Sequence, residues 1–202
     1  MEDNMKGFKI LILLLMTTSI SCGSLTDSRS FIHPDADFSF YQKVGLLPFK
    51  TQADDRLAGE KVTEHFLTEL LIRGELEVMD PGQFNAVAAQ VAGVNVPASM
   101  LELTPEQIGK IADVADIQGI FSGTIHDYKM VQLGGEQYPM ISMTVKFIDA
   151  LTGKVVWQNS VTATGGPNLP IVSIGEEFTL GQLSQKISQG VVKDFYKKAY
   201  PK

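Results

Sequence analysis

The residue in this sequence with the most specific chemical setting is Cys22, the only cysteine of the chain. A single thiol excludes an internal disulfide, a thiolate metal cluster and a Cys-x-x-Cys redox pair. Small residues, Ser19 and Ser21, stand three and one positions before it, and seven consecutive apolar residues occupy positions 10–16. A thiol at the processing site of an exported chain can accept acyl chains, so the predicted chemistry is lipidation of the Cys22 sulfur.

The segment before Cys22 has the features of a secretory signal peptide. Its apolar run is far shorter than the ~20 residues that span a bilayer, but it fits the ~7–15-residue core of such a signal. Lys6 and Lys9 precede this core. We therefore predict a lipoprotein signal peptide at residues 1–21, with palmitate-type acyl chains on Cys22. By analogy with lipoprotein sorting, Gly23 after the cysteine indicates the outer membrane and a periplasm-facing domain.

The same residues also allow a second kind of processing. Ser19-Ile20-Ser21 is a small-x-small site for ordinary signal peptidase, and Ser19 stands where lipoprotein signals usually have leucine. Cleavage at that site would release a soluble protein with a free N-terminal thiol. We favour the anchor because acyl chains contribute ~0.8 kcal/mol for each buried CH₂, whereas the rest of the chain offers no other affinity for membranes.

Two further groups of residues are candidates for chemistry. His65 and Glu69 are one helical turn apart, which is the spacing of two metal ligands on one helix face. The helical repeat turns both away from the apolar face, and no further ligand is in register, so we expect a solvated polar face. His126 and Asp127 are adjacent in a predicted strand and point to opposite faces, which favours ordinary hydrogen bonding over acid–base catalysis.

We predict no catalytic, cofactor-binding or metal site. The sequence has no Gly-x-Ser-x-Gly motif, and Thr152-Gly153-Lys154 lacks the upstream glycine of a phosphate-binding loop. The net charge of −6 disfavours binding to nucleic acids and to anionic lipid head groups. We therefore expect a protein that is not an enzyme and takes no cofactor. The alternative is a small envelope hydrolase with an unrecognised active site.

Hydrophobic periodicity predicts an α/β fold. The predicted order is β-α-β-α-α-β-β-β-α, a single domain at residues 40–202 with a mixed β-sheet packed by helices. Residues 23–37 are polar and aperiodic, so we expect them to lie outside the core, within a flexible tether at residues 22–39. The predicted helices occupy residues 54–74, 81–91, 104–116 and 176–199, and the predicted strands occupy residues 43–49, 76–80, 117–130, 140–149 and 154–162.

Local signals support several of these boundaries. Thr104 and Gln107 have the spacing of a capping box at a helix N-terminus. Gly74 is typical of a helix C-terminus, and Gly59 falls on the buried face of the first helix, where a missing side chain permits close approach to the sheet. Between residues 130 and 140 we expect a loop around Gly134-Gly135 and Pro139.

The assembled segments resemble a known group of envelope proteins. The resemblance is carried by the order of several segments after a lipoprotein signal. They are Val44-Gly-Leu-Leu-Pro-Phe49, the helix with Gly59, Leu76-Glu-Val-Met-Asp80, the segment from Ile117 to Gly123-Thr-Ile125, and Asp149-Ala-Leu-Thr-Gly-Lys-Val-Val-Trp157. They are similar to the periplasm-facing lipoprotein domains typified by CsgG, LpoB and the N-terminal domain of TolB, over roughly residues 40–200. The resemblance implies a non-enzymatic lipoprotein that binds another protein or assembles into a complex, in secretion or cell-wall machinery.

One departure from that group concerns pore formation. CsgG forms an outer-membrane pore through two long amphipathic β-hairpins, and here the segments between residues 117 and 166 are too short to supply them. The resemblance therefore implies an accessory, non-pore-forming member whose partners are envelope proteins or copies of itself. Candidate partner surfaces are the apolar loops around Met100 and Ile171, which alternatively complete the core, and an open sheet edge that accepts a partner strand.

Overall fold

The computed structural model describes residues 26–93, 101–166 and 177–201. They form a seven-stranded mixed sheet in the order β1-β7-β6-β5-β2-β4, and β3 pairs with β5 beside this path. β1, β7, β6 and β5 pair with one another in antiparallel fashion, whereas β2 and β3 pair with β5, and β4 pairs with β2, in parallel. The strands are β1 (Thr26–Ile32), β2 (Lys43–Leu46), β3 (Lys50–Thr51), β4 (Glu77–Val78), β5 (Gly119–Leu133), β6 (Glu136–Asp149) and β7 (Val155–Thr164).

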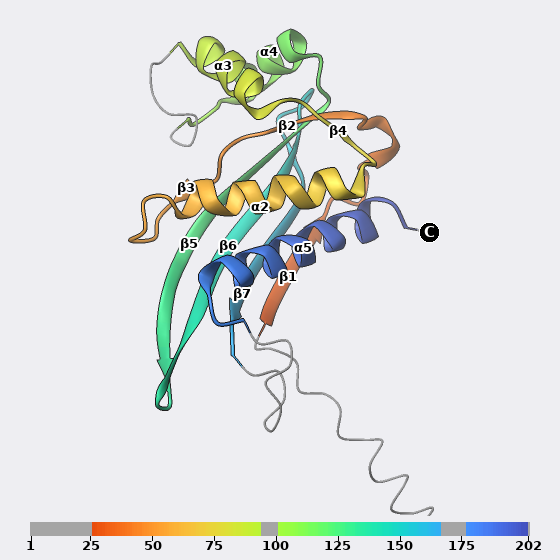
Figure 1. Ribbon diagram of the computed structural model, residues 1–202. Helices are drawn as coiled ribbons and strands as arrows, with labels where there is room; N and C mark the ends of the chain where they lie inside the picture. Colours follow the sequence, from red (N-terminus) through yellow and green to blue (C-terminus); the bar gives the residue numbers. More distant parts are fainter. Residues whose placement is uncertain (1–25, 94–100, 167–176, 202) are drawn as a thin grey trace, which may run out of the picture.

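Helices cover one face and one end of this sheet. α2 (Ala58–Arg73) and α5 (Leu180–Ala199) lie side by side on one face, while α3 (Pro81–Ala92) and α4 (Pro105–Ala115) form a pair at one end (Figure 1). From β2 onwards the elements follow the predicted order, with the two-residue β3 as an addition. The predicted fold class, a single mixed α/β domain, is therefore confirmed.

The local sequence signals are found where they were expected. The Thr104 side chain accepts a hydrogen bond from the Gln107 backbone N–H, and the Gln107 side chain accepts one from the Thr104 backbone, so the capping box is complete. Gly74 ends α2 in the left-handed conformation, with φ of 66°. A Cβ atom on Gly59 would overlap the carbonyl oxygen of Phe49, so this glycine does permit close approach of α2.

The predicted tether contains structure that the sequence pattern did not indicate. β1 lies within the predicted tether at residues 22–39, and the 3-10 helix η1 (Phe38–Phe40) begins at its end. Phe38, which is 4% exposed, belongs to the core rather than to a flexible tether. The first four residues of β1 are exposed, because an edge strand pairs with one neighbour only and buries little side-chain area. Main-chain pairing with β7 holds β1, and apolar periodicity cannot reveal such a strand.

Two clusters of apolar side chains form the core. The larger lies between the sheet and the pair α2 and α5, and its centre is aromatic, with Phe121, Phe147 and Phe195 all fully buried. The smaller lies beneath α3 and α4, around Phe84, and it reaches Ile120 on the opposite face of the sheet. The domain therefore has a packed layer on one face and a separate helical pair closing one end.

A buried polar contact joins η1 to the turn between β6 and β7. The Tyr41 hydroxyl donates to Asp149 Oδ2 at 2.9 Å, and both residues are at most 8% exposed. Asp149 Oδ1 accepts from the backbone N–H and the hydroxyl of Thr152, at 2.7 and 2.6 Å. Burial, together with the neighbouring Asp149 carboxylate, raises the pKa of Tyr41, so its hydroxyl keeps the proton that this hydrogen bond needs.

Candidate functional site

Cys22, the predicted lipidation site, lies outside the described residues, as do Met100 and Ile171 of the predicted apolar loops. Lipidation at Cys22 therefore stays a prediction. Thr26, four residues after Cys22, is paired with Ala163 of β7. Among the described residues, no helix combines the length and the apolar character needed to cross a membrane.

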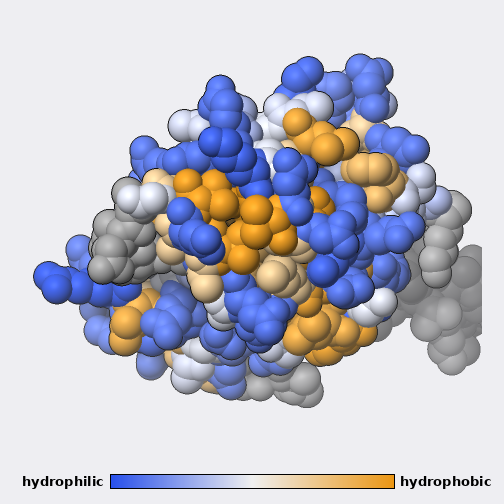
Figure 2. Space-filling view, turned by 90° about the horizontal axis from the view of Figure 1, so that it is seen from above, coloured by the Kyte–Doolittle hydropathy of each residue, from blue (hydrophilic) through white to orange (hydrophobic). Residues whose placement is uncertain are grey.

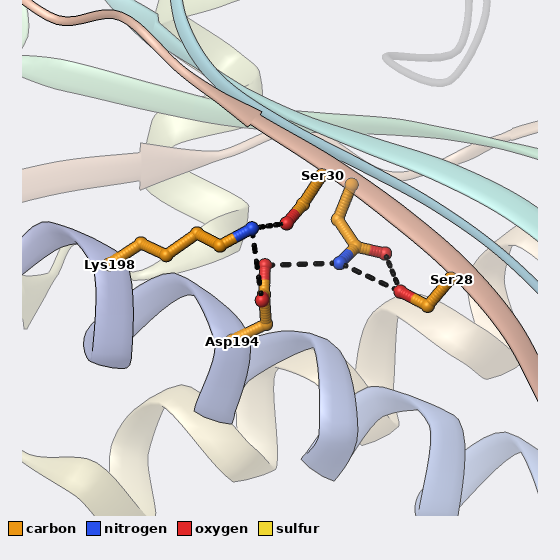
Figure 3. A network of polar contacts seen from close by, with 5 residues as sticks. Ser28, Ser30, Asp194 and Lys198 are labelled. Carbon is orange, nitrogen blue, oxygen red and sulfur yellow. Dashed lines mark hydrogen bonds and ion pairs between the residues drawn. The ribbon is translucent and has the colours of Figure 1, made fainter.

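A buried polar network fixes β1 to the body of the domain (Figure 3). Its centre is Asn159 of β7, which is 1% exposed. The Asn159 amide nitrogen donates to Ser28 Oγ at 3.2 Å and to Asp194 Oδ2 at 3.1 Å, which connects β1 through β7 to α5. Lys198 of α5 lies 3.4 Å from Asp194 Oδ1 and also donates to the Ser30 hydroxyl. The strand nearest Cys22 is thus attached to the longest helix.

Replacing Asn159 by alanine is expected to lower the free energy of unfolding by about 1–3 kcal/mol, because Ser28 and the Asp194 carboxylate lose a buried partner. Urea denaturation measures the loss, and amide hydrogen exchange in residues 26–32 shows whether β1 is loosened in particular. Thr162→Ala, a half-buried hydroxyl on the same strand, is the matched control. Equal stability and equal exchange in the two variants would contradict the role assigned to Asn159.

β1 also provides the long free edge of the sheet. From Asp27 onwards its outer side pairs with no strand among the described residues, whereas the opposite edge strand, β4, has only two residues. The predicted open edge is therefore present on the strand that follows Cys22. Asp27 and Arg29 place charges along it, and such charges are a common device against unspecific edge-to-edge pairing.

The sheet face opposite α2 and α5, which we call the open face, carries rows of hydroxyl side chains. Side chains alternate along a strand, so the neighbours of the buried Met143 and Val145 point to this face. Ser142 Oγ lies 2.9 Å from Thr162 Oγ1, and Thr144 Oγ1 lies 3.1 Å from Ser160 Oγ. These half-buried hydroxyl pairs make a regular polar surface that offers donors and acceptors to a ligand.

His126 lies on the open face, where it makes the ordinary hydrogen bonds that we predicted. Its Nε2 lies 3.1 Å from Thr144 Oγ1, and its Nδ1 lies 2.9 Å from Gln52 Oε1. Hydroxyl, imidazole and amide stand in the order of a nucleophile, a base and an orienting group. However, Thr144 lies within an interior strand paired on both sides, so the ladder engages the backbone N–H groups that an oxyanion would need. The arrangement binds polar groups better than it performs acyl transfer.

A cleft of about 300 Å³ opens where the segment 101–103 overhangs the open face. Its walls include Leu101 and Leu103, and its floor includes Thr124, Thr144 and Lys146, so a polar floor meets apolar walls. The Lys50 ammonium pairs with Glu102 at 3.3 Å beside it. A ligand in this cleft would meet hydroxyl groups and cations on one side and apolar surface on the other.

The pair His65 and Glu69 differs from the prediction in one respect. Glu69 is 6% exposed and His65 is half-buried, so the expected solvated face was wrong for Glu69. α2 packs against α5 as well as against the sheet, and this second neighbour widens the buried arc beyond the apolar stripe. In the part of the chain that the structure describes, no group of three or more His, Cys, Asp and Glu residues could hold a metal ion.

The end of the molecule formed by α3 and α4 carries exposed apolar side chains. Figure 2 looks down on this end and shows apolar side chains gathered between hydrophilic ones. Val114 of α4 is 65% exposed, and Leu151 of the β6–β7 turn is 69% exposed. The turn belongs to this end because a Cβ on Gly153 would lie 2.9 Å from the side chain of Pro105 in α4. We call Val114 and Leu151, with the half-buried Val87 and Val91 of α3, the α3–α4 patch.

Comparison with protein-family models gives no match, and comparison with curated proteins gives none either. Among solved structures, the PelC dodecamer from Paraburkholderia phytofirmans has a TM-score of 0.55 at 17% identity, over 83% of this chain and 95% of that chain. Lipoprotein GNA1162 from Neisseria meningitidis has a TM-score of 0.52 at 14% identity, over 75% of this chain and 99% of that one. This chain shares the fold of both proteins.

The C-terminal domain of LpoB from Escherichia coli is also similar, with a TM-score of 0.44 at 15% identity, over 59% of this chain and 81% of that chain. The predicted likeness to lipoprotein domains is supported at the level of the fold by GNA1162. The finer likeness to CsgG and to the N-terminal domain of TolB stays a prediction.

Proposed function

We propose that this protein is an envelope lipoprotein, anchored through Cys22 on the periplasmic side of the outer membrane, that binds or assembles other envelope proteins or copies of itself. The observation that carries the proposal is the short connection between the lipid acceptor and the fold. Only residues 23–25 separate Cys22 from β1, and β1 is held by β7 and by the Asn159 network. An acyl anchor on Cys22 would thus hold a folded domain directly at the membrane.

The surfaces of the domain support binding as the activity. The free edge of β1, the open face and the α3–α4 patch offer main-chain, polar and apolar contacts, respectively. The α3–α4 patch lies at the end of the sheet opposite the start of β1, so it would point away from the membrane (Figure 1). PelC, which shares the fold, is described as a dodecamer, and this supports self-assembly as one form of the proposed function.

A hydrolase is the less favoured alternative. It would depend on Thr144, His126 and Gln52, whose side chains are hydrogen-bonded in sequence on the open face. Thr144 is β-branched, pairs with Ser160 as well as with His126, and lies within a β-strand rather than in a sharp turn. An accessory role, either in secretion or in cell-wall synthesis, fits the binding surfaces better.

The test is site-specific photo-crosslinking of the full-length protein in intact cell envelopes. A photoreactive amino acid replaces Val114 or Leu151 of the α3–α4 patch, and the matched control places it at the exposed Gln185 of α5. We expect one adduct of defined mass from the patch positions, corresponding either to a second copy of this chain or to one envelope protein, and no such adduct from residue 185. Adducts that are equally weak and heterogeneous at all three positions would contradict a dedicated binding surface there.

A further inference from the structure

The strand register places the tip of the β5–β6 hairpin and the start of β1 at the same end of the molecule. Thr26 pairs with Ala163, Ala163 with Ile141 and Ile141 with Tyr128, so these four residues form one row across the sheet. β1 and β6 run in the same direction, since both are antiparallel to β7. The start of β1 therefore lies toward the end of the sheet at which the hairpin tip projects.

The hairpin continues well beyond that row. From Tyr128 to Leu133 it extends by five residues, which at ~3.3 Å per residue is roughly 17 Å. Figure 1 shows the tip of β5 and β6 projecting past the ends of β1 and β7. Cys22 precedes Thr26 by four residues, which reach at most about 14 Å when fully extended. Because the two lengths are about equal, a lipid on Cys22 would bring the hairpin tip to the membrane surface.

The tip has the composition of a membrane-interface contact. Met130 is 41% exposed and Leu133 is 46% exposed. In a hairpin that projects beyond its neighbouring strands, apolar side chains exposed to water do not stabilise the fold. Phe178, just before α5, is 51% exposed, and its ring stacks on that of Tyr138 with centroids 6.4 Å apart. Aromatic rings with a polar end are enriched at the level of lipid head groups.

The charges near the tip are compatible with such a contact. Between residues 130 and 138 the only ionisable acid or base is Glu136, apart from the Tyr138 hydroxyl. Behind the tip, Lys129 pairs with Asp127 at 2.6 Å, so these two charges largely cancel. The apolar residues therefore reach the interface with a single carboxylate beside them, and that carboxylate can stay in the hydrated head-group layer.

We propose that Met130, Leu133, Tyr138 and Phe178, here called the membrane-contact tip, dip into the lipid head-group layer beside the acyl anchor. The contact fixes the orientation of the domain, with the α3–α4 patch directed away from the bilayer. The occupant is the bilayer rather than a protein, because the lipid acceptor is attached at the same end of the sheet and within the same reach. The proposal rests on the Cys22 anchor of the proposed function.

The test measures how deeply the tip lies in vesicles of phosphatidylethanolamine and phosphatidylglycerol. The mature chain is coupled through the Cys22 thiol to a maleimide-bearing lipid, so anchoring does not depend on processing in cells. A fluorescent amino acid replaces Leu133, and the matched control places it at Leu151, an exposed leucine in the turn at the opposite end. We expect a lipid-bound quencher to remove most of the fluorescence from position 133 and little from position 151.

Two results would overturn the proposal. Equal quenching at positions 133 and 151 would show that the tip has no privileged contact with lipid. A blue shift at position 133 that depends on protein concentration and occurs without vesicles would show that a second copy covers the tip instead. Failure of the Cys22 anchor is recognised separately, because the mass of protein purified from membranes reports whether acyl chains are present.

Discussion

A Cys22→Ala variant is expected to leave the membrane fraction and to become soluble or to stay unprocessed. The sulfur of Cys22 is the predicted acyl acceptor, and each buried CH₂ of an acyl chain contributes ~0.8 kcal/mol to membrane binding. Stable anchoring requires more than one chain, so loss of the acceptor removes nearly all of the affinity that the chain has for a bilayer. The contact made by the membrane-contact tip is too small to replace it. Fractionation of cells, with a carbonate wash of the membranes, measures the distribution.

Ser21→Ala is the matched control, because it keeps a small residue next to the cysteine and leaves the thiol in place. This variant should remain in the membrane fraction with an acylated N-terminal peptide, as shown by mass spectrometry. The Cys22→Ala protein should also keep the far-ultraviolet circular dichroism of the parent, since β1 is held by β7 and by Asn159 rather than by the anchor. Unchanged membrane association of Cys22→Ala would contradict the proposed acyl anchor.

The sequence allows prediction of those elements whose formation depends on local or periodic signals. The capping box at Thr104 and the glycine at position 74 act within one helical turn, so they are readable without knowledge of the rest of the fold. β6 and β7 alternate buried and half-buried residues because one sheet face packs on a core. These patterns are sufficient for the order of elements and the mixed α/β class.

Features that depend on non-local pairing could not be predicted. β1 is polar and exposed, and it is a strand only because β7 offers it an unpaired edge. The expected loop around Pro139 is instead part of β6, where Pro139 pairs with Met130 and its carbonyl accepts from Gly165 at 2.7 Å. Only the two-residue turn at Gly134-Gly135 remains of it, with φ of 64° at Gly134. The projecting hairpin therefore follows from the register and not from the composition.

The candidate site shows the same division. Cys22 is identified by its immediate neighbours, and this is why the sequence alone predicts a cellular location for the protein. The Asn159 network joins residues of β1, β7 and α5 that are 131 and 35 positions apart in the chain, and no spacing rule connects them. The burial of Glu69 depends on α5 as a second neighbour of α2. Surfaces that could bind partners are formed by residues distant in the chain, so they are recognised only once the tertiary structure is known.

Phe195→Ala is expected to be the most destabilising single substitution in the described part of the domain. Phe195 is fully buried, and its ring lies 5.0 Å from Phe121, 5.3 Å from Phe147 and 5.1 Å from Trp157, measured between ring centroids. Removal of a buried phenyl group costs about 3–5 kcal/mol, because the cavity is only partly refilled. The rigid neighbouring rings are poorly able to move into that space, so we expect the upper part of this range.

A domain of this size has a free energy of unfolding of about 5–15 kcal/mol, so the loss is a large share of the total. Equilibrium denaturation in urea measures it, and Phe40→Ala is the matched control, since Phe40 is 47% exposed and should cost little. Phe195→Leu should fall between the two because it keeps most of the apolar volume. The helix that contains Phe195 also contains Asp194 and Lys198, which hold β1. Faster hydrogen exchange in residues 26–32 should therefore accompany the loss of stability. Unchanged exchange there would show that the attachment of β1 does not depend on the packing of the aromatic core.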